Sequence, residues 1–223
     1  MSGGAIVQPQ SKAAGSEDQI VRYNFQERFT HWINGIAYGY LLLTGLALFT
    51  PYMFWMGTVL GGGATIRYWH PWVGLVYLAS ILQMHRMWSG DMAITESDRQ
   101  WSKNLEHYVK NEDDKMPVQG RFNAGQKQFY WAMFYCVLVL FVTGIVMWVP
   151  EYVPRNLHWV MPIIVFIHSA VALITIAAFM IHVYMSIWVT PGSLKAMIEG
   201  SVSRAWAKMH HRLWYEKITG RKN

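Results

Sequence analysis

Four histidines lie in or beside long apolar stretches of this 223-residue sequence: His31, His70, His168 and His182. An ionisable side chain inside a membrane segment is costly and usually serves a function. His168 and His182 share one apolar run and are fourteen residues apart. In a helix, that spacing puts them on nearly the same face, about 21 Å apart along the axis. Because neutral imidazole is a common metal ligand, the pattern indicates two ligand positions at different depths.

The composition favours lipid around these histidines. Only 14% of the residues are charged, against about 25% in soluble domains. Twelve Trp and twelve Tyr supply the rings that gather at membrane interfaces. The net charge of +6 fits basic cytoplasmic loops, and no basic stretch indicates nucleic-acid binding. The single cysteine, Cys136, excludes an internal disulfide and a four-cysteine metal site, and we interpret it as a packing residue.

The apolar runs predict an all-α integral membrane protein with a bundle of four transmembrane helices. Each run has the roughly 20 residues needed to cross about 30 Å of hydrocarbon, and each must be helical to satisfy its backbone in lipid. Residues 1–20 are predicted to be a flexible tail, 21–191 the membrane domain with a polar loop at 89–127, and 192–223 an amphipathic basic tail. The four predicted spans are about 29–55, 69–88, 129–149 and 157–189.

The distribution of Lys and Arg predicts the orientation. Basic residues are concentrated before the first span, in the long loop and in the tail, whereas the two other connections hold one each, Arg67 and Arg155. The positive-inside rule then puts both termini and the long loop in the cytoplasm.

Orientation assigns a depth to each histidine. His31 and His182 lie at the cytoplasmic level, and His70 and His168 lie at the outer level. Two imidazoles can fill both axial positions of a haem iron. The sequence therefore predicts two stacked haems, an inner one between His31 and His182 and an outer one between His70 and His168.

Some residues have competing interpretations. His85 could replace His31 as the inner ligand, although its neighbours Arg86 and Trp88 indicate an interfacial position. The remaining histidines are predicted to be solvated: His107, His158, His210 and His211. Several glycines would let either a flat macrocycle or another helix approach closely: Gly35, Gly39, Gly45 and Gly144.

These motifs resemble those of the gamma subunit, a cytochrome b, of respiratory formate dehydrogenases. The resemblance covers the chain from about Val21 onwards. The histidine motifs are shared with hydrogenase and thiosulfate reductase cytochromes b, whereas NAGQK and the tail point more narrowly to formate dehydrogenase. The matching stretches are RFTHWING, RYWHPWVG, RFNAGQK, FIHSA, IHVYMSIW and GSLKAMIEGSVSRAWAKMHH.

The resemblance implies a function in the bacterial inner membrane. A large molybdenum or tungsten pterin alpha subunit would oxidise formate, and an iron–sulfur beta subunit with its own membrane anchor would pass the electrons on. This chain would conduct them through two haem b groups, outer then inner, to menaquinone or ubiquinone. The implied quinone-binding residues are Asn123, Gly125, Gln126 and His182.

Three points stay open from the sequence alone. Asn123 followed by Gln126 is also a helix capping box, and the two roles are compatible. The tail could lie on the membrane surface or dock against a partner. The alternative functions are the cytochrome b of a hydrogenase or sulfur-compound reductase, and a haem-free anchor or transporter whose histidines carry protons or zinc.

Overall fold

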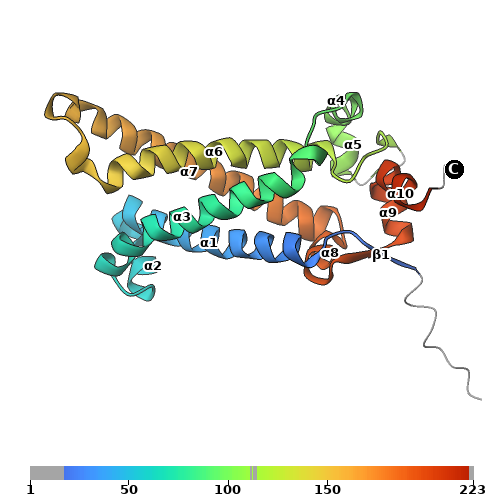
Figure 1. The fold of residues 1–223 in the computed structure, drawn as a ribbon, viewed down its shortest axis with the longest axis horizontal. Coiled ribbons are helices and arrows are strands. Elements are labelled where there is room, and N and C mark those ends of the chain that lie inside the picture. The colour runs from blue at the N-terminus through green and yellow to red at the C-terminus, as the bar shows by residue number, and fades with distance from the viewer. Residues whose placement is uncertain (1–17, 111, 113–114, 221–223) are drawn as a thin grey trace, which may run out of the picture.

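The computed structural model describes residues 18–110, 112 and 115–220 (Figure 1). Its main feature is a set of four long helices lying side by side. The first helix packs chiefly along the second, and the third chiefly along the fourth, so the bundle consists of two helical hairpins. The four helices are α1 (Phe25–Phe49), α3 (Gly63–Trp88), α6 (Ala124–Trp148) and α7 (Met161–Tyr184).

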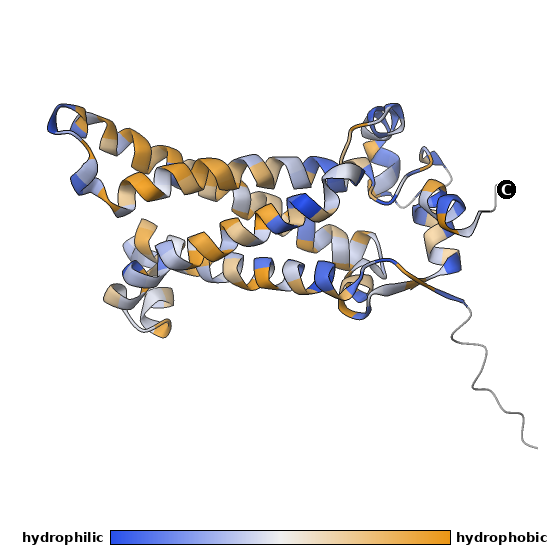
Figure 2. Ribbon diagram, in the orientation of Figure 1, coloured by the Kyte–Doolittle hydropathy of each residue, from blue (hydrophilic) through white to orange (hydrophobic). Residues whose placement is uncertain are grey.

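Three helices are long and apolar enough to cross a membrane: α1, α6 and the continuous segment Arg155–Val189 that contains α7. Hydrophobic residues predominate along α7 (Figure 2). Several of its large apolar side chains are exposed, including Phe166 and Ile181, which are 71% and 62% exposed. Such a surface is suited to lipid rather than water, and the chain is a membrane protein. The helix α3 has 26 residues, but Arg67 and Arg86 near its ends lower its hydropathy, and its predicted role as a span stays a prediction.

The first helix differs from its predicted bounds. It begins at Phe25, because the Asn24 side chain accepts a hydrogen bond from the Glu27 amide and Glu27 bonds back, closing a capping box. It ends at Phe49 rather than near residue 55. Thr50 is extended, as the residue before a proline prefers to be. The rest of the predicted span is a 3-10 turn (Pro51–Met53) and the short helix α2 (Phe54–Val59).

The other spans differ less. α3 begins at Gly63, six residues before the predicted start, directly after Gly61 and Gly62 turn the chain with positive φ angles of 96° and 89°. The capping box of Asn123 and Gln126 starts α6, which confirms the predicted cap. Short 3-10 turns (Pro150–Tyr152 and Arg155–Val160) lead into α7, and a π-helical turn (Met185–Val189) follows it.

The long loop and the tail are folded. The loop contains a 3-10 turn (Ser89–Asp91), α4 (Glu96–Lys103) and α5 (Leu105–Val109). Of the predicted N-terminal tail, residues 1–17 lie outside the described residues. Residues 19–20 belong to strand β1 (Gln19–Val21), which pairs antiparallel with β2 and sets Ile20 opposite Val202. The tail consists of α8 (Ser193–Glu199), β2 (Ser201–Ser203), α9 (Arg204–His210) and α10 (Arg212–Thr219).

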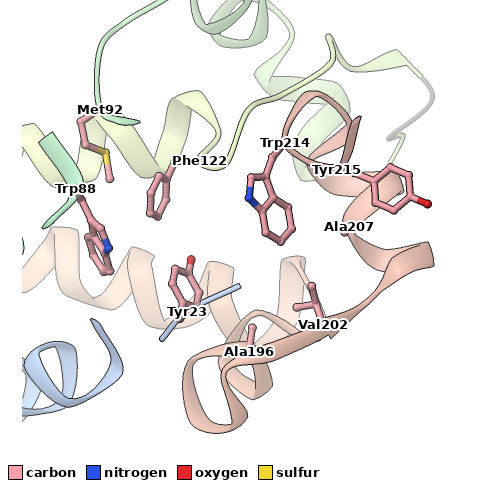
Figure 3. Close-up of a cluster of buried hydrophobic side chains, with 9 residues drawn as sticks. All are labelled: Tyr23, Trp88, Met92, Phe122, Ala196, Val202, Ala207, Trp214 and Tyr215. Atoms are coloured by element: carbon pink, nitrogen blue, oxygen red, sulfur yellow. The ribbon is translucent and has the colours of Figure 1, made fainter. Parts of the chain in front are cut away.

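The tail packs against its own chain. Figure 3 shows the cluster that joins the tail, the long loop and the starts and ends of the long helices, which we call the polar-end core. Trp214 and Tyr215 of α10 are each only 8% exposed in it. The prediction that the tail lies on the membrane or on a partner did not foresee this packing. The polar-end core consists of Tyr23, Trp88, Met92, Phe122, Ala196, Val202, Ala207, Trp214 and Tyr215.

Candidate haem and quinone site

The inner pair of histidines comes together from α1 and α7. The ring centroids of His31 and His182 are 6.3 Å apart, with an interplanar angle of 50°. Phe129 of α6 stacks on His182 at 4.5 Å and 7°. Two imidazoles that bind one metal from opposite sides, each at about 2 Å, have centroids roughly 6 Å apart. The separation therefore suits an ion held between the two rings.

The outer pair lies toward the other end of the bundle. His70 is in the second turn of α3, and His168 is in the second turn of α7. Among the described residues, no ring contact joins His70 to His168, whereas one joins His31 to His182. A threonine on the other helix of the same hairpin contacts each ring. The Nδ1–Oγ1 distance is 2.7 Å between His70 and Thr44, and 2.9 Å between His168 and Thr143.

Three glycines on the histidine-bearing helices α1 and α3 have open space beside them. A Cβ added at Gly35, Gly39 or Gly74 would meet no atom within 4 Å. Gly35 follows His31 by four residues and Gly74 follows His70 by four, so each lies on the same helix face as its histidine. No other helix fills the space beside Gly35 and Gly39. Close helix packing, the competing interpretation of these two glycines, therefore does not explain them. Paired imidazole donors with room beside them are what a flat macrocycle requires.

The two remaining predicted glycines lie directly against the outer ligands. A Cβ at Gly45 would be 3.6 Å from Cε1 of His70, and a Cβ at Gly144 would be 3.3 Å from Cε1 of His168. Each glycine follows one of the contacting threonines, Thr44 and Thr143. Sequence reasoning missed both threonines, although the repeated Thr-Gly pair near the ends of two apolar runs was an available signal.

Histidines outside the two pairs have other partners. His85 stacks on Phe134 at 4.6 Å, and its Nδ1 lies 2.5 Å from the Tyr130 hydroxyl. The structure sets His31 beside His182 instead. His158 is exposed, as predicted. His107 is half-exposed and its Nδ1 lies 2.6 Å from Glu112, and His210 is half-buried.

His211 corrects the prediction of a solvated side chain, because it is only 2% exposed. Its Nδ1 donates to the Gly120 carbonyl at 2.8 Å, so its Nε2 accepts from Arg22 at 2.9 Å. Burial, reinforced by the Arg22 charge, lowers the pKa of His211 well below its usual value. The ring is therefore a neutral link between the long loop, the N-terminal segment and α10.

The predicted quinone residues surround the start of α6. Asn123 and Gln126 line a cavity of about 230 Å³ between the long loop and the tail, together with Trp101, Tyr108 and Thr190. Gly125 lies beneath Trp101, since a Cβ there would come within 3.0 Å of that ring. His182 is not among the described residues that line this cavity.

A buried ion pair holds the long loop to the same helix start. Lys127 Nζ lies 2.7 Å from Asp98 Oδ2, and both side chains are less than a tenth exposed. Burial by itself raises the pKa of Asp98, but hydrogen bonds from Lys127 and Thr95 outweigh it and the net pKa is lowered. The carboxylate stays charged and fixes α4 against α6, one residue beyond Gln126.

Comparison with known proteins finds matches over most of the chain. Residues 22–200 match the family described as prokaryotic cytochrome b561. The formate dehydrogenase cytochrome b556(fdo) subunit of Escherichia coli K12 is 36% identical over 90% of this chain and 94% of its own length. The nitrate-inducible formate dehydrogenase cytochrome b556(Fdn) subunit of the same strain is 35% identical over 89% and 91%. The corresponding Haemophilus influenzae subunit is 29% identical over 91% and 84%.

Proposed function

The chain belongs to the prokaryotic cytochrome b561 family, and on that premise we propose that it is the membrane cytochrome b subunit of a formate dehydrogenase. It conducts electrons from the complex to a quinone. The observation that carries the proposal is the 6.3 Å separation of the His31 and His182 rings, in a chain matched over nearly its whole length by subunits of that name.

The four histidines hold two haem b groups, His70 and His168 the outer and His31 and His182 the inner. When bound, these groups supply one-electron transfer along the bundle. The chain's own part is to fix the two sites in a line. α7 contributes one ligand to each, fourteen residues apart, and α1 and α3 contribute the opposite ligands. Lipid-facing apolar side chains keep water from both.

The end of the bundle that carries the polar-end core faces the cytoplasm. Lys and Arg concentrate in the long loop and the tail, which supports this orientation. α3 is then a fourth span that returns the chain, and both termini are cytoplasmic in the bacterial inner membrane. The iron–sulfur beta subunit, with its membrane anchor, and the molybdenum or tungsten pterin alpha subunit approach from the opposite face.

Quinone binds at the start of α6, near His182. The capping box uses Oδ1 of Asn123 and Oε1 of Gln126, which leaves the side-chain amide nitrogens as donors for a quinone carbonyl. Gly125 keeps room for the Trp101 ring at the wall of the cavity. Protons drawn from the cytoplasm and electrons delivered from outside would together charge the membrane.

The haem assignment is tested by spectroscopy on the chain purified in mild detergent. A dithionite-reduced minus air-oxidised spectrum, with pyridine quantitation, should give two b haems per chain. Either His168→Ala or His182→Ala should reduce this to about one, while His158→Ala, at an exposed histidine, should leave two. Folded protein without haem, from haem-replete cells, would overturn the proposal.

The quinone site is tested by variants that keep the cap. Asn123→Asp and Gln126→Glu retain the oxygen acceptors that cap α6 but lose the amide nitrogens. Both should weaken reduction of the haems by a short-chain quinol, seen as a raised half-saturating concentration, at unchanged haem content. Unchanged half-saturation in both variants would exclude these side chains as quinone ligands and leave the haem assignment intact.

A further inference from the structure

Thr44 and Thr143 form the side-chain hydrogen bonds to the two outer histidines, His70 and His168. Thr44 is fully buried and Thr143 is 8% exposed. Each hydroxyl bonds to a carbonyl one turn earlier in its own helix, Thr44 to Tyr40 at 2.8 Å and Thr143 to Val139 at 2.7 Å. A hydroxyl has one proton to donate, and in both residues a carbonyl already receives it.

The direction of the contact to histidine follows. Since the threonine proton is engaged, the oxygen is the acceptor and Nδ1 of the histidine is the donor, at 2.7 Å for His70 and 2.9 Å for His168. In a neutral imidazole with a proton on Nδ1, the lone pair lies on Nε2. Both outer rings thus carry their free lone pair on the nitrogen remote from the threonine.

The two threonines occupy equivalent places in the two hairpins. Thr44 lies five residues before Phe49, the last residue of α1, and Thr143 lies five residues before Trp148, the last of α6. His70 and His168 each lie seven residues after the first residue of their helices, Gly63 and Met161. A glycine follows each threonine, and the histidine Cε1 lies against it. The same device is built twice, once in each half of the bundle.

We propose that Thr44 and Thr143 are positioning residues that fix the tautomer and ring orientation of His70 and His168, so that Nε2 of each faces the outer haem iron. The inference rests on the proposed function for the haem itself. The hydrogen bond also makes each imidazole a better electron donor, which favours the oxidised iron and lowers the potential of the outer haem. Of the inner pair, His31 has no such partner, since its Nδ1 is buried with no hydrogen-bond partner among the described residues.

A purely structural role is the competing explanation, because a threonine within a helix often bonds to the carbonyl one turn back. The chain offers a matched control. Thr175 of α7 is 2% exposed and bonds to the Ala172 carbonyl at 2.7 Å, but its oxygen accepts from the Tyr38 hydroxyl rather than from a histidine. Thr175→Val therefore removes a buried hydroxyl that bonds to the carbonyl three residues earlier and contacts no histidine.

The experiment compares Thr44→Val, Thr143→Val, Thr44→Ser and Thr175→Val in the full chain. Optical redox titration should show that both histidine-facing valine variants raise the potential of one haem and leave the other unchanged. Their affinity for that haem should fall roughly 10- to 100-fold. Thr44→Ser, which keeps the acceptor, should restore both properties, and Thr175→Val should match the parent. Loss of one haem in Thr44→Val with retention in Thr44→Ser supports the inference equally.

A second readout is independent of haem. Nitrogen-15 chemical shifts of labelled histidine, in chain prepared without haem, should show His70 and His168 protonated at Nδ1, and the valine variants should lose this preference. The inference would be overturned if both valine variants kept the haem potentials of the parent, or if the histidines of the parent showed mixed tautomers. In either case, two bound haems would leave the proposed function intact. A parent chain that bound no haem but kept the Nδ1 tautomers would instead overturn the function.

Discussion

The outer and inner histidine pairs use the same side chains in different surroundings. Each outer ring is hydrogen-bonded at Nδ1 to a threonine on the other helix of its own hairpin, Thr44 for His70 and Thr143 for His168. The inner rings come from α1 and α7, in different hairpins. The aromatic ring of Phe129 packs on His182, and the ring of Trp32 meets that of His31 edge-on.

The difference separates two ways of preparing a ligand. A hydrogen bond to Nδ1 fixes both the plane and the tautomer of an imidazole, whereas stacking restricts the plane alone. At the inner end, the polar-end core and the buried Lys127–Asp98 ion pair hold the long loop and the tail against the starts of α1 and α6 and the end of α3. We therefore expect the outer site to depend on single hydroxyls and the inner site on the packing of loop and tail.

The largest expected effect comes from filling the space beside each pair. Gly35→Leu should abolish the inner haem and keep the outer, and Gly74→Leu should do the reverse, because a leucine would occupy the open space at each position. Pyridine quantitation should give about one haem per chain in each variant, at two different potentials. Ile36→Leu, at an exposed position next to Gly35, is the control. Two haems in both leucine variants would contradict the assignment of these spaces.

The next effect concerns the packing of the inner end. Asp98→Ala leaves the Lys127 ammonium buried without its partner, which typically costs about 3–5 kcal/mol. Detergent-induced unfolding should report this loss, together with weaker quinol oxidation, while the outer haem stays bound. Glu96→Ala, which breaks an exposed pair with Arg99, should cost under about 1 kcal/mol. Equal costs in the two variants would show that the buried pair does not hold the loop.

Acidification should also act on the inner end first. The folded-state pKa of His211 lies well below its unfolded value, because the ring is buried and faces Arg22, with His210 beside it. Above about pH 6.5 both states are neutral and nothing changes. Below that pH His211 binds a proton in the unfolded chain but not in the folded chain. The free energy of unfolding therefore falls by about 1.4 kcal/mol per pH unit until the pH reaches the folded-state pKa.

A variant isolates this titration. His211→Gln keeps a donor for Gly120 and an acceptor for Arg22 but cannot titrate near neutrality. Its free energy of unfolding should depend less steeply on pH between 5 and about 6.5 than that of the parent. The same steepness in both proteins would assign the acid sensitivity to other groups.

The smallest effect is expected at the helix cap. Asn123→Ala removes the side-chain acceptor for the Gln126 amide and should cost about 1 kcal/mol of unfolding free energy. Asn123→Asp keeps that acceptor and should cost much less. If both variants lost the same free energy of unfolding, the oxygen that caps the helix would contribute nothing to stability, and the loss would be due to the Asn123 amide nitrogen.

The features that depend on residues close together in the sequence were predicted from the sequence alone. The four histidines, their spacing on a helix and the apolar runs predicted a helical bundle with paired imidazoles. The motifs around them indicated a resemblance to formate dehydrogenase cytochromes b, which the comparisons confirm. The cap at Asn123 was also predicted, because a capping box is a local pattern of two residues three apart. The end of α1 is also set locally, by the Thr50-Pro51 pair. The hydropathy pattern did not reveal this end, because the residues after Pro51 are apolar too.

The tertiary structure decided what depends on neighbours distant in the sequence. His211 is buried because Arg22 and Gly120 come to it from segments far away in the chain. Thr44 faces His70, and Thr143 faces His168, only because each pair of helices folds into a hairpin with a particular register. Composition and periodicity assign a residue to an element and a depth. Which side chains meet across elements is set by packing, and here packing supplies the partner that orients each outer ligand.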